Sequence, residues 1–307
     1  MSKVVCVGEV MVELARGSDG RFGLGFGGDT FNTAVYLARA GIPVAYATAL
    51  GDDMFSGQLL DLARHEGVGQ ETILQVRGRV PGLYLITTDD KGERTFHYWR
   101  DTAPARALFE LDGWQPVAEQ IVGARAVYFS GITLSLYTNT GLGRFLATLE
   151  MAGTHGAWRV FDGNFRPRGW GADLGRARTV FAEAMKRANI AMPTFEDEVA
   201  LWGDASPMAT IERMTTYGVQ EVVVKNGPSG ALVYADGQVI EVPVERQVLP
   251  VDTTGAGDSF NAGYLAARLQ GASAADAALA GHRLAGTVIM HRGALIPRTT
   301  PDGMRMN

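Results

Sequence analysis

The chain of 307 residues contains one cysteine, Cys6, so no disulfide bond can close within it. A chain without disulfides suits a reducing compartment, and we expect a cytoplasmic protein. No apolar segment reaches the length of about 18 residues that a membrane-spanning helix needs. The apolar start at Val4–Val7 soon meets Glu9 and Glu13 and lacks a small-residue cleavage site, which predicts a first strand and not a signal peptide.

Positive charge is also scarce. The chain has 28 Lys and Arg against 33 Asp and Glu, a net charge of −5, and no long basic run. Binding to nucleic acid requires a cationic face, which this composition does not supply. We therefore expect a small-molecule partner and no contact with nucleic acid or membrane.

Several catalytic signatures are missing from the sequence. The G-x-x-x-x-G-K-[ST] loop, the G-x-S-x-G elbow and the H-E-x-x-H helix do not occur. These absences exclude P-loop phosphoryl transfer and argue against an esterase and against a protein-bound transition metal. Any metal ion is expected to be Mg²⁺ brought by nucleotide phosphates.

Hydrophobic residues make up 46% of the chain and follow the pattern of an α/β protein. Short apolar or β-branched runs alternate with longer segments of helical period, as in βα units around a mainly parallel sheet. The predicted strands are Val4–Val10, Val44–Ala49, Ala126–Ser130, Val160–Asp162, Ile190–Met192 and Glu221–Lys225. An Asp-Gly turn at 236–237 predicts an antiparallel hairpin late in the sheet.

A helix is predicted where apolar residues between Phe31 and Ala38 share one face. Asp29 or Thr30 is the expected N-cap of this helix. Gly41 is the expected end, because glycine readily adopts the left-handed backbone that closes a helix.

Residues 72–106 break the βα rhythm. Residues 83–88 and 94–100 predict two strands around a turn at 90–93. A two-stranded ribbon is only marginally stable by itself. This ribbon must therefore rest on something, either as a flap over an active site or against a partner subunit.

The most specific motif lies between Val251 and Gly263. A strand-like approach leads to Gly255-Ala256-Gly257, and a helix follows. Such a helix start binds anions, because its first N–H groups lack intrahelical partners and the helix dipole adds positive charge. Asp258 is either a plain helix cap or a carboxylate that takes the proton of an acceptor hydroxyl, and the flanking glycines favour the second interpretation.

A second glycine cluster spans residues 23–28 and matches G-x-G-x-x-G. A dinucleotide site is not favoured, because the polar stretch at 16–21 separates the cluster from the strand that this motif requires. We interpret the segment as a tight helix entry that exposes Gly28, Asp29 and Asn32 to a polyhydroxylated ligand. A structural turn with Asp29 as its cap fits the segment equally well.

Guanidinium groups gather after the strand that ends at Asp162. Arg166 and Arg168 follow this strand, and Arg100 lies on the predicted ribbon. A carboxylate ligand would pair with these groups, whereas a neutral sugar would not repay their desolvation, so an acidic substrate is expected. Local carboxylates or ATP phosphates are the alternative partners of Arg166 and Arg168.

Together these residues resemble the ribokinase (PfkB) family of carbohydrate kinases. The late family motif D-T-x-G-A-G-D is present from Asp252 to Asp258, and the early Gly-Gly entry with its downstream Asn is present at 27–32. The resemblance covers nearly the whole chain. It implies one kinase domain over residues 1–307, with three α/β/α layers, a mainly parallel central sheet and a small β-sheet lid.

The lid is expected to come mainly from about residues 72–106 with part of 10–28. In the family this lid often also forms the dimer interface. The resemblance therefore implies a homo-oligomer that assembles through the lid.

The resemblance also implies roles for single residues. Asp258 corresponds to the catalytic base, and Gly255, Ala256 and Gly257 correspond to the anion hole. The expected substrate-binding residues, with the arginines and tyrosines at the keto-acid end, are Gly28, Asp29, Asn32, Tyr84, Tyr98, Arg100, Arg166 and Asp258. The expected residues around ATP, which would carry Mg²⁺, are Asn164, Lys225, Gly227, Gly230, Gly255, Gly257 and His282.

Within the family, the segments at 25–39, 81–84, 92–100 and 164–168 resemble members that act on 2-keto-3-deoxygluconate. This implies phosphorylation of the C6 hydroxyl to give 2-keto-3-deoxy-6-phosphogluconate. A kinase for fructose, ribose or a nucleoside and a non-catalytic sugar-acid sensor are the alternatives. The stretch Thr194–Glu198 lacks the Asn of the family's N-x-x-E motif, so the acidic residue that would organise Mg²⁺ is left open.

Overall fold

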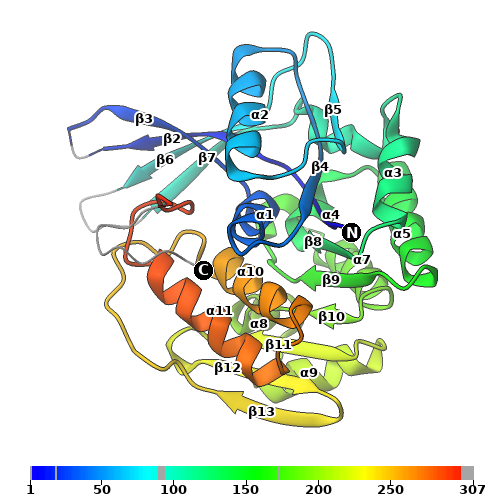
Figure 1. The fold of residues 1–307 in the computed structure, drawn as a ribbon, viewed down its shortest axis with the longest axis vertical. Coiled ribbons are helices and arrows are strands. Elements are labelled where there is room, and N and C mark those ends of the chain that lie inside the picture. Colours follow the sequence, from blue (N-terminus) through cyan, green and yellow to red (C-terminus); the bar gives the residue numbers. More distant parts are fainter. Residues whose placement is uncertain (1, 18, 89–93, 172, 299–307) are drawn as a thin grey trace.

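Two β-sheets organise the chain in the computed structural model, which describes residues 2–17, 19–88, 94–171 and 173–298 (Figure 1). The larger sheet has nine strands in the order β13-β12-β11-β10-β9-β8-β1-β4-β5. They are β1 (Val4–Val7), β4 (Val44–Leu50), β5 (Ile73–Gln75), β8 (Ala126–Ser130), β9 (Trp158–Asp162), β10 (Ile190–Ala191), β11 (Glu221–Lys225), β12 (Ala231–Ala235) and β13 (Gln238–Val242). Neighbouring strands are parallel from β5 to β11, whereas β12 and β13 complete the sheet antiparallel.

Helices cover both faces of the larger sheet. One face carries α1 (Asp29–Arg39), α2 (Met54–Glu66), α10 (Ala256–Leu269) and α11 (Ala274–Val288). The other face carries α3 (Trp114–Val122), α4 (Gly131–Leu136), α5 (Asn139–Thr154), α7 (Leu174–Met185), α8 (Phe195–Trp202), α9 (Pro207–Thr216) and the 3₁₀ helix η1 (Pro104–Glu110). Two short helices, α6 (Pro167–Trp170) and η2 (Gly227–Ser229), follow β9 and β11.

The two hydrophobic cores lie on opposite sides of this sheet. Val4 and Cys6 of β1 belong to the core under α1 and α10, and Val5 and Val7 belong to the core under α3 and α5. This division follows from the strand geometry, since successive side chains point to opposite faces. The predicted three-layer α/β/α architecture with a mainly parallel sheet is confirmed.

The smaller sheet, called the lid sheet below, has the strand order β3-β2-β6-β7 and extends to the left in Figure 1. Its strands are β2 (Met11–Arg16), β3 (Phe22–Gly27), β6 (Leu83–Thr88) and β7 (Arg94–Trp99). The predicted ribbon of β6 and β7 gains its support from β2, which pairs with β6 in parallel. The turn predicted at 90–93 lies outside the described residues.

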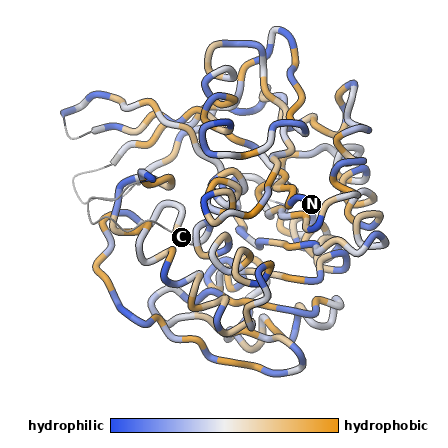
Figure 2. The backbone as a smooth tube through the Cα atoms, in the orientation of Figure 1, coloured by the Kyte–Doolittle hydropathy of each residue, from blue (hydrophilic) through white to orange (hydrophobic). Residues whose placement is uncertain are grey.

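Both ends of the region expected to form the lid, residues 72–106, lie outside the lid sheet. They belong to the larger sheet and to the helices that pack on it. Ile73–Gln75 is β5, which pairs with β4. Residues 104–110 form η1, whose Leu108 and Phe109 are fully buried in the core. The lid sheet itself exposes the apolar side chains of Phe22, Leu24 and Trp99, and hydrophobic and hydrophilic residues alternate along it in Figure 2.

The first predicted strand is shorter than expected. The sequence predicts a strand over Val4–Val10, but β1 ends at Val7 and β2 begins at Met11 in the other sheet. The backbone passes very close to α1 at this point, because a Cβ atom on Gly8 would lie 2.1 Å from Thr30 Oγ1. Residues 8–10 are therefore the connection between the two sheets.

Helix α1 begins one residue earlier than predicted with Asp29 as its N-cap, and two residues earlier than predicted with Thr30. Its N-cap is Gly28, whose carbonyl accepts the Asn32 N–H at 2.8 Å, and Asp29 is already the first helical residue. A side chain at position 28 is excluded, since a Cβ atom there would lie 2.1 Å from the Glu9 carbonyl oxygen. Gly41 follows the helix with a φ of +78°, as expected for its end.

The predicted hairpin at Asp236-Gly237 is confirmed. It joins β12 to β13, and both turn residues have positive φ angles, 51° and 75°. This pair of left-handed residues is the geometry that a two-residue turn between twisted strands requires. Within the described residues, every helix is too short or too polar to span a bilayer.

A buried ion pair fixes α1 against α2. Arg39 Nε lies 2.9 Å from Glu66 Oε2 and Arg39 Nη2 lies 3.0 Å from Glu66 Oε1, and these side chains are only 7% and 6% exposed. Removal of one partner leaves a buried charge unpaired. The position of α1 therefore depends on Glu66.

We predict that Glu66→Ala lowers the free energy of unfolding at pH 7 by about 3 kcal/mol, because Arg39 loses its carboxylate partner. Asp61→Ala is the control: Asp61 pairs with Arg64 on the surface, where its side chain is 73% exposed, and the expected loss is under about 0.5 kcal/mol. Urea unfolding of both variants measures the difference. Equal losses would contradict the assignment.

Candidate active site

A cavity of about 1010 Å³ lies between the carboxyl ends of the parallel strands, the first turns of α1 and α10, and the lid sheet. Asp162 enters it at the end of β9, Asn164 just after β9, Thr194 after β10, and Lys225 at the end of β11. Open α/β sheets bind ligands at this edge, because the loops that leave the strands are free to carry functional side chains. Parallel strands thus bring together residues that are far apart in the sequence.

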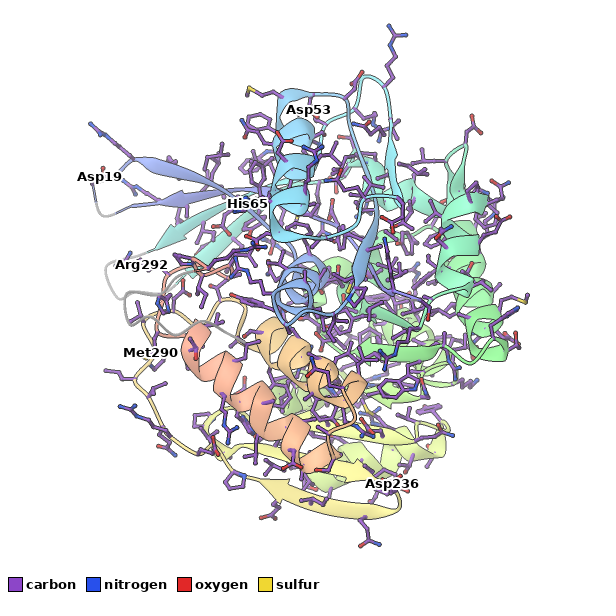
Figure 3. The ribbon with its side chains drawn as sticks, viewed as in Figure 1. Asp19, Asp53, His65, Asp236, Met290 and Arg292 are labelled. Atoms are coloured by element: carbon purple, nitrogen blue, oxygen red, sulfur yellow. The ribbon has the colours of Figure 1, made fainter. Side chains whose placement is uncertain are left out.

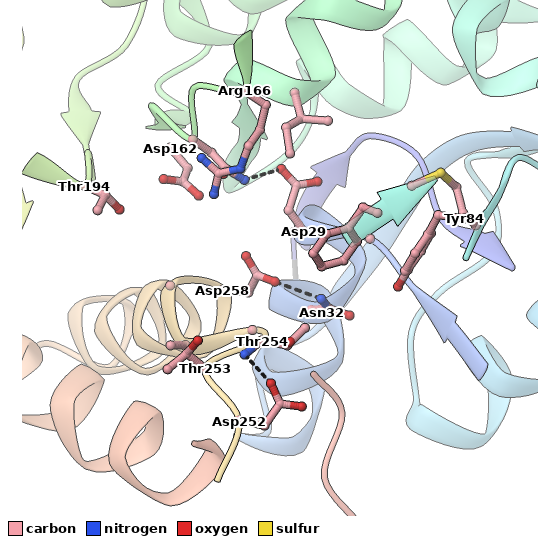
Figure 4. Close-up of a pocket in the computed structure, with 18 of the residues that line it drawn as sticks. Asp29, Asn32, Tyr84, Asp162, Arg166, Thr194, Asp252, Thr253, Thr254 and Asp258 are labelled. Carbon is pink, nitrogen blue, oxygen red and sulfur yellow. Dashed lines mark hydrogen bonds between the residues drawn. The ribbon is translucent and has the colours of Figure 1, made fainter. Parts of the chain in front are cut away.

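The first turn of α10 forms one wall of the cavity. Gly255 is its N-cap, with a φ of +76°, and a Cβ atom there would lie 2.8 Å from Ala294 Cβ. Asp252 fixes the preceding loop, since its Oδ1 accepts the Thr254 N–H at 2.9 Å (Figure 4) and its Oδ2 accepts the Gly293 N–H at 2.8 Å. The helix start that the motif predicted is therefore present and faces the cavity.

Asp258 lies in the first turn of α10 and faces α1 across the cavity. Its Oδ2 accepts a hydrogen bond from Asn32 Nδ2 at 2.8 Å (Figure 4), and its backbone carbonyl accepts one from Thr33 Oγ1 at 3.2 Å. The interpretation of Asp258 as a plain helix cap is wrong, because the N-cap is Gly255 and no side chain caps this helix. The carboxylate is free of a capping task and points into the cavity.

Desolvation and neighbouring charge shift the protonation of Asp258. Burial, followed by repulsion from Asp29, raises the pKa of Asp258 to about 7, against the smaller opposing effect of the Asn32 hydrogen bond. The pKa of Asp29 is also raised, chiefly by burial, although Asn164 Nδ2 donates to its Oδ2 at 2.8 Å. Two carboxylates with raised pKa values therefore share one cavity.

Lys225 supplies a cation beneath the first turn of α10. Its ammonium donates to Asp162 Oδ1 at 3.1 Å and to Asn261 Oδ1 at 2.9 Å, and the residue is 8% exposed. A Cβ atom on Gly257 would lie 3.7 Å from Lys225 Nζ. An ammonium has three donors, so the helix start and one remaining lysine donor can act on the same anion.

The arginines of the cavity have carboxylate partners. Arg100 forms an ion pair with the buried Glu9, and Arg166 Nη1 lies 2.9 Å from Asp197 Oδ1. Arg168 instead donates to the carbonyl of Phe96 in the lid sheet. The alternative that Arg166 pairs with a local carboxylate is confirmed, and both Arg100 and Arg166 also line the cavity.

The expected substrate residues on the lid sheet and on α1 are brought together. Tyr84 and Tyr98 line the cavity with ring centroids 6.0 Å apart, and the Arg100 guanidinium lies 5.8 Å from the Tyr98 ring. Gly28 and Asn32 line it from α1. The structure therefore places these expected substrate residues, which are far apart in the sequence, in the lining of one cavity.

Three of the expected nucleotide residues lie outside the lining of this cavity: Gly227, Gly230 and His282. Gly230 has a φ of +93°, and a Cβ atom there would lie 2.4 Å from the Val242 carbonyl oxygen. Backbone conformation and packing therefore explain why this residue is a glycine. His282 Nε2 lies 3.1 Å from the same oxygen, and its ring contacts Phe260. Their contact with a nucleotide stays a prediction.

Outside the α10 motif, three charged residues of the cavity are not among the expected site residues: Glu9, Asp162 and Arg292. Glu9 and Asp162 follow or end buried parallel strands, so the rule that places ligands at strand ends could have found them. Arg292 follows α11 and lies on the side that carries the lid sheet in Figure 3. No sequence pattern marks Arg292 as a site residue, because only the tertiary fold brings its segment to the cavity.

The described part of the chain contains no group of three or more His, Cys, Asp and Glu side chains arranged to hold a metal ion. The cavity nevertheless offers several carboxylate oxygens, among them those of Asp162 and Asp258. Carboxylates suit Mg²⁺, which keeps most of its waters and binds mainly through phosphate oxygens.

Known proteins with similar sequences and folds are carbohydrate kinases. Residues 1–301 match the family described as pfkB family carbohydrate kinase. The 2-dehydro-3-deoxygluconokinase of Escherichia coli (strain K12) is 43% identical over 306 residues, which cover 96% of this chain and 97% of that protein. The solved 2-dehydro-3-deoxygluconokinase of Thermotoga maritima has a TM-score of 0.83 at 22% identity, with 96% of each chain covered. A putative ribokinase II of E. coli, solved in complex with ATP and Mg²⁺, has a TM-score of 0.84 at 23% identity, with 96% of this chain and 94% of that chain covered.

These matches extend over the larger sheet, the lid sheet and the α10 motif alike, since the family match leaves out only the last six of the 307 residues. The predicted resemblance is confirmed. The chain belongs to the pfkB family of carbohydrate kinases.

Proposed function

We propose that this kinase transfers the γ-phosphoryl group of ATP to the C6 hydroxyl of 2-keto-3-deoxygluconate, with Asp258 as the base. The observation that carries the proposal is the position of the Asp258 carboxylate, which lines a cavity beside the first turn of α10 and shares that cavity with Arg100 and Arg166. The name of the E. coli relative supports the choice of substrate. An acidic sugar also suits a cavity that contains guanidinium groups.

The reaction joins the hydroxyl oxygen to the γ-phosphorus, breaks the bond between this phosphorus and the bridging oxygen, and releases ADP. Asp258 orients the hydroxyl and takes its proton as the new bond forms. The first N–H groups of α10 and the ammonium of Lys225 stabilise the charge of the transferred group. The lid sheet limits the access of water, which would otherwise accept the phosphoryl group.

ATP and Mg²⁺ are the proposed co-substrates, as in the solved E. coli neighbour. Mg²⁺ would neutralise phosphate charge during transfer. Lys225 and the α10 start would hold phosphate oxygens, and Asp162 would hold a water of the metal. Asp197 is less suited, because it does not line the cavity and Arg166 contacts both of its carboxylate oxygens.

We also propose a cytoplasmic enzyme that assembles through its lid sheet. The exposed Phe22, Leu24 and Trp99 give this sheet an apolar surface. Single exposed apolar residues are common, whereas several on one small sheet indicate a contact surface.

A direct assay separates the proposed function from its alternatives. The purified chain is given ATP and Mg²⁺ with 2-keto-3-deoxygluconate, fructose, ribose or a nucleoside, and ADP formation is measured. ADP formed fastest with the keto acid supports the proposal. Faster ADP formation with fructose, ribose or the nucleoside would show that the assigned substrate is wrong. Inactivity with all four compounds would leave the sugar-acid sensor as the better hypothesis.

We predict that Asp258→Asn lowers kcat at least about 100-fold, because the amide cannot accept the hydroxyl proton. The KM values of both substrates should change little, since the amide keeps the shape of the side chain. Folding raises the pKa of Asp258 from 3.8 to about 7, so this carboxyl group lowers stability as pH rises between these values, and the full loss is present above pH 7. The variant should therefore melt at or above the wild-type temperature at pH 8. Turnover near the wild-type value would refute the role as base.

We predict that kcat/KM falls on the acid side of a pKa near 7. The pKa of Asp258 is raised to about 7, and only the ionised carboxylate accepts a proton. Below this pH the rate should fall about tenfold per pH unit. A pH profile at saturating Mg²⁺ measures the effect, and a rate that stays constant down to pH 5 would contradict it.

We predict that Arg166→Ala raises the KM for the sugar acid about tenfold or more, because a charge-assisted contact to the carboxylate is lost. The KM for ATP should stay within about twofold. Arg64→Ala is the matched control, because Arg64 also pairs with an aspartate, at 2.6 Å, but on the exposed surface of α2. An unchanged KM in Arg166→Ala would place the acid group elsewhere.

A further inference from the structure

The glycines of β3 are not explained by the proposed phosphoryl transfer. Gly23, Gly25 and Gly27 alternate along the strand and therefore share one face of the lid sheet. A Cβ atom on Gly27 would lie 2.5 Å from Tyr84 Oη, and one on Gly25 would lie 3.4 Å from Glu13 Oε1. On Gly23 it would meet nothing closer than a backbone oxygen at 3.9 Å. The absence of side chains at Gly25 and Gly27 thus leaves space for one particular pair of neighbouring side chains.

This pair is Glu13 of β2 and Tyr84 of β6. The two residues are partners in the strand register, and Gly25 is the partner of Glu13 on the other side. The Tyr84 hydroxyl donates a hydrogen bond to Glu13 Oε2. Tyr84 is 8% exposed and lines the cavity, whereas Glu13 does not line it. Glu13 therefore acts on the cavity through the tyrosine.

The hydrogen bond decides what Tyr84 offers to a ligand. A phenol has one O–H donor, and Glu13 receives it. Burial and the charge of Glu13 both raise the pKa of Tyr84, so the hydroxyl keeps this proton at physiological pH. Tyr84 Oη is left as an acceptor toward the cavity. A ligand hydroxyl can donate to it, whereas a ligand carboxylate would be repelled by it and by the charge of Glu13 behind it.

We propose that Glu13 is a positioning residue for substrate selection, which orients the Tyr84 hydroxyl so that its oxygen accepts a hydrogen bond from a hydroxyl of the sugar acid. Gly25 and Gly27 keep the space that this pair needs. The inference rests on the proposed function. It also changes one expectation, because Tyr84 contacts the hydroxyl part of the substrate and the acid group is left to the arginines.

The arrangement gives the substrate one direction in the cavity. Tyr84 and Glu13 form an acceptor on the lid sheet, whereas Arg166 enters the cavity from the loop after β9 (Figure 4) and Arg100 lies against the Tyr98 ring just after β7. A sugar acid has a carboxylate at one end and hydroxyls along the rest of its chain. Only one orientation places the hydroxyls at the acceptor and the carboxylate at the cations.

A double-mutant cycle tests the proposal with Glu13→Leu, Tyr84→Phe and the double variant. We expect each single variant to raise the KM for the sugar acid about tenfold, with kcat and the KM for ATP within twofold. The double variant should lose no more than Tyr84→Phe alone, because Glu13 acts only through that hydroxyl. Glu13→Gln, which keeps an acceptor oxygen, should restore most of the affinity. Losses that multiply in the double variant, or an unchanged KM in Glu13→Leu, would overturn the proposal.

The β3 glycines provide a second test that does not remove a charge. Gly27→Ala forces the Tyr84 hydroxyl to move and should raise the KM for the sugar acid the most, and Gly25→Ala should have a smaller effect. Gly23→Ala is the matched control on the same strand and face, with an expected KM equal to that of the wild type. Equal KM values for Gly27→Ala and Gly23→Ala in folded protein would refute the proposal, even if Glu13→Leu failed to fold.

Failure of the proposed function gives a different result. If the wild type does not phosphorylate 2-keto-3-deoxygluconate, the assigned substrate is wrong whatever the variants do. If the wild type does so and the losses multiply or the glycine variants are equal, the substrate stands and only the role of Glu13 is wrong.

Discussion

The hydrogen bond from Asn32 Nδ2 to Asp258 Oδ2 joins α1 to α10 at the place where the first turns of both helices meet. Each helix carries a carboxylate in that turn, Asp29 on α1 and Asp258 on α10. A helix start stabilises negative charge through its unpaired N–H groups and its dipole. Burial works against this effect and is the larger influence on both pKa values. The site therefore holds two carboxylates with raised pKa values, and the pKa of Asp258 reaches about 7.

Three cations of the cavity are paired with carboxylates. Arg100 pairs with Glu9, Arg166 with Asp197, and Lys225 with Asp162. An arriving anion has to share each of these three cations with a carboxylate that is already there. A weakly charged ligand gains little from such an exchange, whereas a ligand with a full carboxylate or a polyphosphate with its metal ion gains more. Selection of charged ligands thus follows from pairing within the protein.

The sequence was sufficient for the parts of the site whose structure is local. The helix after Gly255 and the carboxylate in its first turn follow from the spacing of Gly, Ala and Asp, and the structure confirms both. The N-cap of α1 could not be placed in this way, because contact with the Glu9 carbonyl selects Gly28. The limits of the lid sheet depend on pairing between β2 and β6, which lie about 70 residues apart, as for Glu13 and Tyr84. Local patterns contain no information on such a register.

The two glycine clusters show why a motif has to be judged in its fold. At 255 the missing side chain allows a left-handed N-cap packed against Ala294, so that backbone N–H groups face the cavity. At 25 and 27 the backbone is an ordinary strand, and the missing side chains leave room for Glu13 and Tyr84. A glycine pattern by itself does not distinguish these uses, because both need only the absence of a Cβ atom. The partner atoms within 3 Å decide between them: at 255 they belong to Ala294, in the segment that follows α11, and at 27 to the Tyr84 side chain of the site.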